Sequence, residues 1–202
     1  TDSGRLYLID FSTLKIKGIQ ENVADYSLHQ KEEIIFFIRF SDGIYKYNPI
    51  NNAVNKVRYS TTLDPVKVIT LSRSVVCVED VTKGVFIINE LTGKTQAIVT
   101  SRSSAVRLHD YHAASGYLLC TDFKSYGNGI SYYNIEVKSR LVKGQIVVKG
   151  QYRSPNCLYS ANHNIIIATN LSEDPDGVLI TEPPSLYSFK TGGVIKTLGS
   201  EY

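Results

Sequence analysis

Short apolar stretches recur along the chain, and each is followed by a turn signal. The most compact of them are residues 33–39, 74–79, 116–121 and 164–169. Residues 66–71 and 105–111 alternate between apolar and polar side chains, a pattern typical of half-buried strands. No long stretch has the 3.6-residue period of an amphipathic helix. The pattern therefore predicts an all-β chain without a substantial helix.

A five-residue motif occurs five times. Its first position is always aliphatic, its second is aromatic in four copies, its fourth is always a large side chain and its fifth is always polar. A turn dipeptide ending in Gly precedes three copies, at Asp42-Gly43, Lys83-Gly84 and Asn128-Gly129, where Gly is free to adopt a positive φ. The five copies are Leu6–Asp10, Ile44–Asn48, Val85–Asn89, Ile130–Asn134 and Leu186–Lys190.

The spacing of the copies predicts the architecture. Their last residues are numbers 10, 48, 89, 134 and 190, so the intervals are 38, 41, 45 and 56 residues. A period of roughly 40–45 residues with four strands per unit is the signature of a β-propeller blade. We therefore expect a single β-propeller domain or a partial propeller over residues 1–202, with blade ends near residues 20, 60, 100, 149 and 199.

The motif resembles that of a divergent WD-repeat propeller, in which the third strand of a blade often ends in Trp-Asp after an Asp-Gly turn. The matching pairs here are Ile9-Asp10, Tyr47-Asn48, Ile88-Asn89 and Tyr133-Asn134. The chain contains no Trp, and it lacks the Gly-His pair of that family. Quinoprotein-like and kelch-like propellers therefore stay open as alternatives.

The blade count is uneven. The chain has five hairpins of third and fourth strands but only four pairs of first and second strands, which makes about four and a half blades. The chain could be part of a six- or seven-bladed ring, a partner could donate the missing strands, or a five-bladed ring could close on strands without a clear signal. We favour the first, and the absence of Met also favours a piece of a longer protein.

Composition narrows the class of protein. Hydrophobic residues make up 43% and charged residues 20% of the chain, which excludes wholesale disorder. No apolar run approaches the roughly 20 residues of a membrane span. The net charge of +3 and a pI near 8.6 fall short of the values typical of nucleic-acid binders. Three cysteines without a CxxC pair indicate neither a disulfide framework nor a zinc site. We therefore expect a reducing compartment, either cytoplasmic or nuclear.

The sequence predicts no catalytic, cofactor-binding or metal site. His109 and His112 would point to opposite faces of a regular strand, and the WD-repeat resemblance implies that a polar residue here forms hydrogen bonds within its blade. Asp80, Asp122 and Asp174 follow successive second strands, so a channel lined with carboxylates is conceivable, although turn formation explains them as well. No nucleophile elbow or phosphate-binding loop is present.

The strongest indication of function is a pair of long loops. Residues 122–128 and 171–184 both connect a second strand to a third strand, and they belong to neighbouring blades, so they emerge on one face. We expect partner contacts from Tyr126, Glu173, Asp174, Asp176 and Glu182. The sequence thus favours a non-catalytic interaction scaffold that binds other protein subunits in an intracellular assembly. The alternative is a propeller enzyme or small-ligand binder with a site in the central channel.

Overall fold

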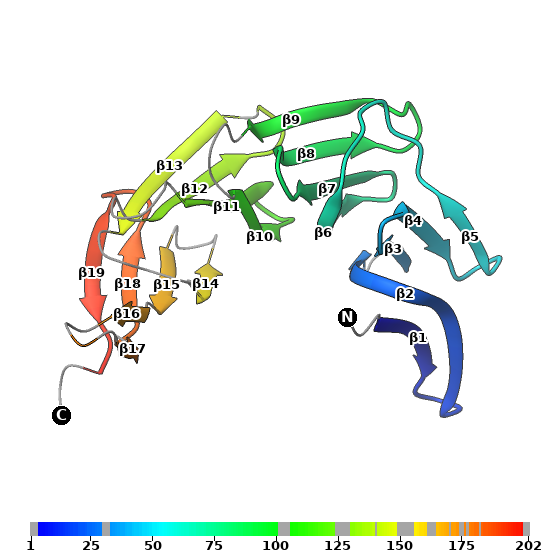
Figure 1. Ribbon diagram of the computed structural model, residues 1–202, viewed down its shortest axis with the longest axis horizontal. Helices are drawn as coiled ribbons and strands as arrows, with labels where there is room; N and C mark the ends of the chain where they lie inside the picture. The colour runs from blue at the N-terminus through cyan, green and yellow to red at the C-terminus, as the bar shows by residue number, and fades with distance from the viewer. Residues whose placement is uncertain are drawn as a thin grey trace. The chain divides into compact units, whose positions relative to one another are not determined.

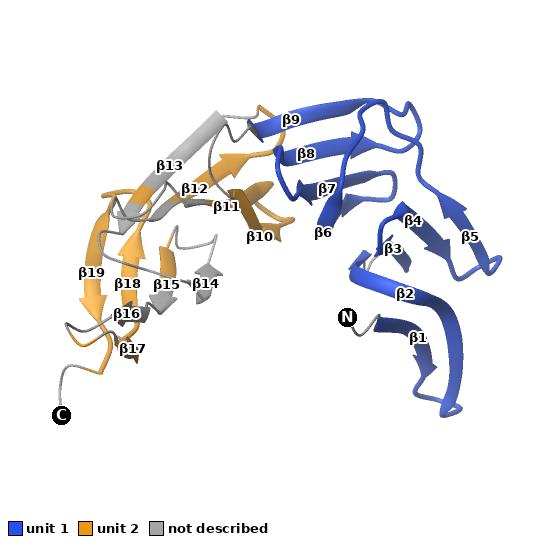
Figure 2. Cartoon of the chain, viewed as in Figure 1, with its two compact units in different colours: residues 1–100 blue, residues 101–202 orange. Residues whose placement is uncertain are grey.

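The chain folds as two compact units, residues 1–100 and residues 101–202 (Figure 2). A computed structural model describes residues 4–29, 33–100, 106–123, 130–139, 141–148, 156–160, 165–169, 171–173, 176, 178–181 and 183–199. All regular structure in these ranges is β-strand, so the predicted all-β class is confirmed. These ranges contain no helix that is long and apolar enough to cross a membrane.

Unit 1 contains two antiparallel sheets (Figure 1). The first sheet has the order β1-β2-β3-β4-β5, and the second has the order β6-β7-β8-β9. The strands of the first sheet are β1 (Gly4–Asp10), β2 (Lys15–His29), β3 (Ile34–Arg39), β4 (Gly43–Asn48) and β5 (Ala53–Lys56). Those of the second sheet are β6 (Pro65–Ser72), β7 (Val75–Asp80), β8 (Gly84–Asn89) and β9 (Thr95–Thr100).

Unit 2 contains two further four-stranded sheets and a small hairpin. The third sheet consists of β10 (Val106–His112), β11 (Tyr117–Phe123), β12 (Ile130–Glu136) and β13 (Leu141–Val148). The fourth sheet consists of β14 (Asn156–Ser160), β15 (Ile165–Thr169), β18 (Ser185–Ser188) and β19 (Gly193–Thr197). The hairpin is formed by β16 (Leu171–Glu173) and β17 (Leu179–Thr181).

The five motif copies fall on strands β1, β4, β8, β12 and β18. Tight turns set the start of two of these strands, because Gly43 and Gly84 have φ values of +118° and +109°. A Cβ at Gly43 would also lie only 2.9 Å from the Tyr59 hydroxyl oxygen, so a larger residue would force the tyrosine side chain to shift. In the three four-stranded sheets the motif strand is the third strand, as its spacing predicts, and the five-stranded first sheet contains two motif strands, β1 and β4.

The first and second sheets of unit 1 pack face to face. Phe36, Ile38 and Ile44 of the first sheet share one buried cluster with Val78 and Ile88 of the second. Burial of such side chains contributes about 25 cal/mol per Å² of apolar surface removed from water. The hydrophobic effect is therefore the main attraction between the two sheets.

Hydrogen bonds also join the same two sheets. The Val68 backbone N–H donates to the Asp25 carboxylate at 2.7 Å, and the Thr70 N–H donates to the Ser27 hydroxyl at 2.8 Å. These bonds join β2 to β6, so side chains of one sheet satisfy the backbone of the next. They satisfy backbone groups whose burial without a partner would be costly.

Strand β2 runs through a predicted blade end. The sequence predicts a blade end near residue 20, and β2 continues unbroken past this position, from Lys15 to His29. Its first half pairs with β1 and its second half pairs with β3, with a register shift between Val23 and Asp25. Asn22 adopts a φ of +59° beside this shift, a conformation that Asn tolerates better than most residues. The bulge bends the strand, so a single strand serves both partners.

Two of the three cysteines are core residues. Cys77 on β7 and Cys120 on β11 form no disulfide, and their side chains are fully buried in their sheets. Each acts as a small apolar core residue. The Cys157 side chain lies outside the part of the chain that the structure describes.

Candidate interaction surface

The insertion between β15 and β18 forms a sheet of its own. Strands β15 and β18 pair directly with each other, so the residues between them are not needed to complete the fourth sheet. Within the insertion, β16 and β17 pair antiparallel, with Ser172 opposite Ile180. We call these two strands and the residues between them the insertion hairpin.

The insertion hairpin presents apolar side chains to solvent. Val178 and Ile180 are exposed large hydrophobic residues, and Asp176 beside them is exposed as well. Each strand of a two-stranded sheet also has one edge without a strand partner. Such short hairpins are only marginally stable alone. Within the described residues, the hairpin therefore combines an unpaired backbone edge, exposed apolar side chains and the exposed Asp176.

The end of the insertion is attached to the fourth sheet. The Leu198 backbone N–H, just after β19, donates to the Pro184 carbonyl oxygen at 2.7 Å. This bond fixes the point where the chain leaves the insertion and enters β18. The hairpin is therefore anchored to the sheet at its C-terminal end.

The structure describes only part of the predicted contact set. Asp176 lies in a turn and is exposed. Glu173 is the last residue of β16, although its side chain lies outside the described part of the chain. Tyr126, Asp174 and Glu182 also lie outside the described residues. Their contribution to binding stays a prediction.

Asp80 has a structural role in its turn. Its carboxylate accepts hydrogen bonds from the backbone N–H groups of Asp64, Thr82 and Lys83 at 2.7–2.9 Å. Burial raises the pKa of this carboxyl, but the three N–H donors outweigh burial and hold the pKa below its ordinary value. Asp80 thereby ties the β7–β8 turn to the segment before β6. The Asp122 and Asp174 side chains lie outside the described residues, so the carboxylate-lined channel stays untested.

The two histidines on β10 form local hydrogen bonds. The His109 Nε2 atom lies 2.8 Å from the Thr121 hydroxyl oxygen on β11, within the same sheet. The His112 Nδ1 atom lies 2.9 Å from the Ser115 hydroxyl oxygen in the following turn. The predicted bonding within the blade is therefore confirmed for His109. Among the residues that the structure describes, no group of three His, Cys, Asp or Glu side chains could hold a metal ion.

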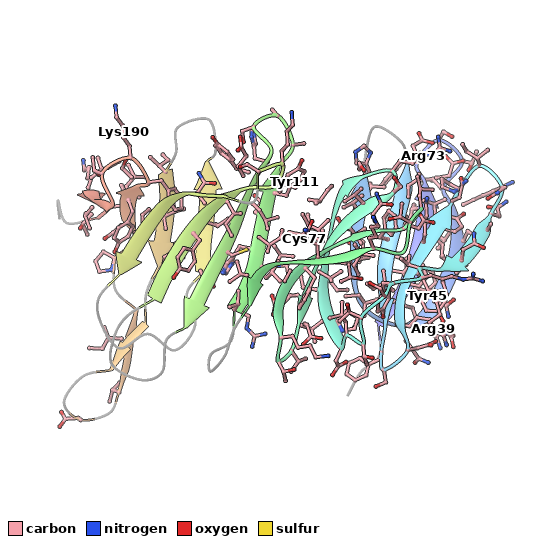
Figure 3. All side chains as sticks on the ribbon, turned by 90° about the horizontal axis from the view of Figure 1, so that it is seen from above. Arg39, Tyr45, Arg73, Cys77, Tyr111 and Lys190 are labelled. Carbon is pink, nitrogen blue, oxygen red and sulfur yellow. The ribbon has the colours of Figure 1, made fainter. Side chains whose placement is uncertain are left out.

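A charged cluster in unit 1 escaped the sequence analysis. The Asp42 carboxylate accepts hydrogen bonds from Lys56 Nζ at 2.6 Å and from the Tyr45 hydroxyl at 2.7 Å, and it lies 3.0 Å from Arg39. Figure 3 shows Arg39 and Tyr45 together at one edge of the unit, and the guanidinium carbon lies 5.3 Å from the ring centre. The Lys56 hydrogen bond is the main cause of a lowered Asp42 pKa.

The role of this cluster is structural. Its carboxylate is bound by the two neighbouring cations and the tyrosine hydroxyl, an arrangement that stabilises the β3–β4 turn against β5. The sequence indicates only one part of this cluster, the Asp42-Gly43 turn. Strand pairing brings the other members together, because Tyr45 lies opposite Lys56.

Comparison by sequence finds no relative. No family model matches the chain. No curated protein matches it either.

Comparison by structure finds propellers. Hydrazine synthase from Kuenenia stuttgartiensis matches with a TM-score of 0.70 and 12% identity, over 94% of this chain and 58% of that protein. The Cps50 (Swd1) β-propeller domain of Myceliophteria thermophila matches with a TM-score of 0.60 and 9% identity, over 100% of this chain and 82% of that domain. An oligogalacturonate lyase, solved in complex with manganese, matches with a TM-score of 0.65 and 10% identity, over 96% and 59%.

The fold is that of a β-propeller. At 9–12% identity the matches show the fold alone, and they do not select the WD-repeat family over others. This chain spans little more than half of two of the matched proteins. The three four-stranded sheets are each a blade, and the second half of β2 with β3, β4 and β5 makes a fourth blade. Strand β1 with the first half of β2 supplies the extra half-blade that the motif count predicts.

Proposed function

We propose that this propeller is a non-catalytic scaffold that binds other protein subunits, with the insertion hairpin as its main contact. The observation that carries the proposal is the separate two-stranded sheet between β15 and β18, with Val178 and Ile180 exposed on it. A hairpin that the blade does not need and that exposes apolar residues is suited to binding.

The chemistry of the hairpin indicates the kind of partner. Glu173, Asp174, Asp176 and Glu182 place four carboxylates within or beside it. A basic surface of a protein subunit would be attracted to these charges, mainly through a faster association rate. An apolar side chain of that partner would contact Val178 and Ile180, and Tyr126 on the neighbouring loop would add an aromatic contact.

Two observations support a role without catalysis. The Asp80 carboxylate is occupied by three backbone donors, and His109 contacts Thr121 within its own blade. Cys77 and Cys120 are buried and form no disulfide, which fits a reducing compartment, so we propose that the protein is cytoplasmic or nuclear. The divergent WD-repeat motif is consistent with this role, and membership of that family is part of the proposal.

Deletion of the hairpin tests the proposal. Affinity purification of the full-length protein with mass spectrometry identifies the partner, and the Kd is then measured with both proteins purified. Replacing residues 172–183 with a short Gly-Ser linker should leave the thermal unfolding transition in place. It should raise the Kd at least tenfold, which corresponds to about 1.4 kcal/mol.

A matched pair of variants separates the hairpin from general surface hydrophobicity. V178S with I180S should weaken binding, whereas V194S with I195S, which removes two exposed apolar side chains from β19, should not. Full affinity after deletion of the hairpin would place the binding surface elsewhere. A purified protein that turns over a small molecule would favour the alternative, a site in the central channel.

A further inference from the structure

The first blade exposes two side chains whose counterparts in the second blade are buried. Tyr26 and Leu28 on β2 are 60% and 50% exposed, whereas Val68 and Thr70 on β6 are 2% and 7% exposed. Strand register makes these positions equivalent. Tyr26 lies opposite Phe37, which pairs with Tyr45, and Val68 lies opposite Val78, which pairs with Phe86. Tyr45 and Phe86 occupy the same column of the five-residue motif.

The first two strands of the neighbouring blade cover Val68 and Thr70. Phe36 on β3 belongs to the same buried cluster as Val68, and Asp25 and Ser27 on β2 accept the hydrogen bonds from the Val68 and Thr70 N–H groups. The side chains on the innermost strand of a blade are thus buried by the first and second strands of the blade before it.

The blade that precedes the first blade in the chain is only half present, and the half that is present is the outer one, formed by β1 and the first half of β2. Leu6 of β1 packs against Phe37 and Tyr47, so the half-blade covers the outer part of the first blade. Strand β1 ends the order of its sheet, whereas β8 and β12 each pair with a preceding second strand, β7 or β11. The half-blade therefore has a third and a fourth strand, and in the described part of the chain no second strand lies beside β1.

We propose that the edge of β1, together with Tyr26 and Leu28, binds a two-stranded antiparallel β-hairpin that forms the first and second strands of this half-blade. Its second strand pairs with Gly4–Asp10, and its apolar face covers Tyr26 and Leu28. A free strand edge beside exposed apolar side chains is the usual template for such pairing.

The hairpin belongs to the same polypeptide. In the second and third sheets, the strand that pairs with the third strand directly precedes it in the sequence. Only Val81, Thr82 and Lys83 separate β7 from β8. By this rule the hairpin comes from chain that precedes Gly4. This proposal is independent of the partner that the insertion hairpin binds.

Thiol reactivity in the native full-length protein tests whether the site is covered. L28C should react with a maleimide at least tenfold more slowly than L91C, a control in an exposed turn of the same unit. The unmodified protein gives the background from its own cysteines. Equal rates for the two variants would overturn the proposal, because Leu28 would then be open to solvent.

A photo-reactive phenylalanine analogue at position 26 identifies what covers the site. We expect a cross-linked product of unchanged mass, with the adduct mapping to an alternating apolar segment that precedes Gly4 in the same polypeptide. A product of twice the mass would identify a second copy of the chain, and a foreign peptide would identify a partner protein. Either of these results, or an adduct elsewhere in the chain, would overturn the proposal.

Discussion

Strands β1 and β8 carry the same motif in different surroundings. Phe86 and Ile88 on β8 are 8% and 0% exposed, whereas Tyr7 and Ile9, in the same columns on β1, are 48% and 47% exposed. The first sheet covers β8 on this face. The difference shows that a blade does not bury its own motif, because burial depends on the sheet that precedes it.

The largest difference in the free energy of unfolding should appear when Ile88 and Ile9 are truncated to alanine. I88A should destabilise the chain by about 2–5 kcal/mol, because it opens a cavity in a packed cluster. I9A should cost about 0.5 kcal/mol or less in the 202-residue chain, because the side chain is already half in water. Chemical denaturation of the two variants measures both values. Equal losses would mean that β1 is as well packed as β8.

A smaller difference in the free energy of unfolding should appear when the aspartates beside these strands, Asp80 and Asp10, are replaced with alanine. D80A should destabilise the chain by about 1–3 kcal/mol, because it removes a buried carboxylate that accepts hydrogen bonds from three backbone N–H groups. Asp10, at the exposed end of β1, bonds to Ser12 and Thr13, and these bonds lower its pKa to about 2. D10A should have a much weaker effect on stability than D80A.

The Asp80 contribution should depend on pH. Its pKa is lower in the folded chain than in the unfolded chain, so its stabilisation is complete above the ordinary Asp pKa of 3.8. It should disappear as the pH falls below that value through the folded-state pKa. Denaturation between pH 7 and pH 2 should therefore show the wild type and D80N converging at low pH. A constant gap would contradict this origin.

A still smaller difference in stability should separate two ion pairs of unit 1, one mostly buried and one exposed. Lys46 Nζ lies 2.6 Å from the Glu90 carboxylate and joins the first sheet to the residue after β8, with both side chains mostly buried. Arg5 and Glu21 pair between β1 and β2 in full contact with solvent. A double-mutant cycle should give about 1 kcal/mol for Lys46–Glu90 and no measurable coupling for Arg5–Glu21. Equal coupling would mean that the environments of the two pairs are alike.

The sequence predicted the third strands well because their signal is local. Aliphatic and aromatic positions alternate within five residues, and Gly43 and Gly84 mark the preceding turns with positive φ. The continuation of β2 through residue 20 could not be read in this way. Gly18 and Asn22 suggest a break, and only the pairing of one strand with both β1 and β3 keeps it extended.

The functional sites were less accessible to sequence analysis. The acidic residues of the insertion are visible as composition, but the pairing of β16 with β17 depends on a register between residues separated by a loop. The Arg39, Asp42, Tyr45 and Lys56 cluster likewise depends on the pairing of three strands. The exposure of Tyr26 and Leu28 depends on which strands lie beside them, and a local sequence pattern does not indicate those neighbours.

Hydrogen exchange of the β1 amides tests the central claim most directly. In the 202-residue chain, amides on the outer edge of β1 should exchange at least tenfold faster than the amides of β8, because β8 has a strand on each side and β1 has only β2. In the full-length protein, the β1 amides should gain protection to the level of β8. Equal protection of β1 and β8 in the 202-residue chain would contradict the account, because the half-blade would then be complete without further strands.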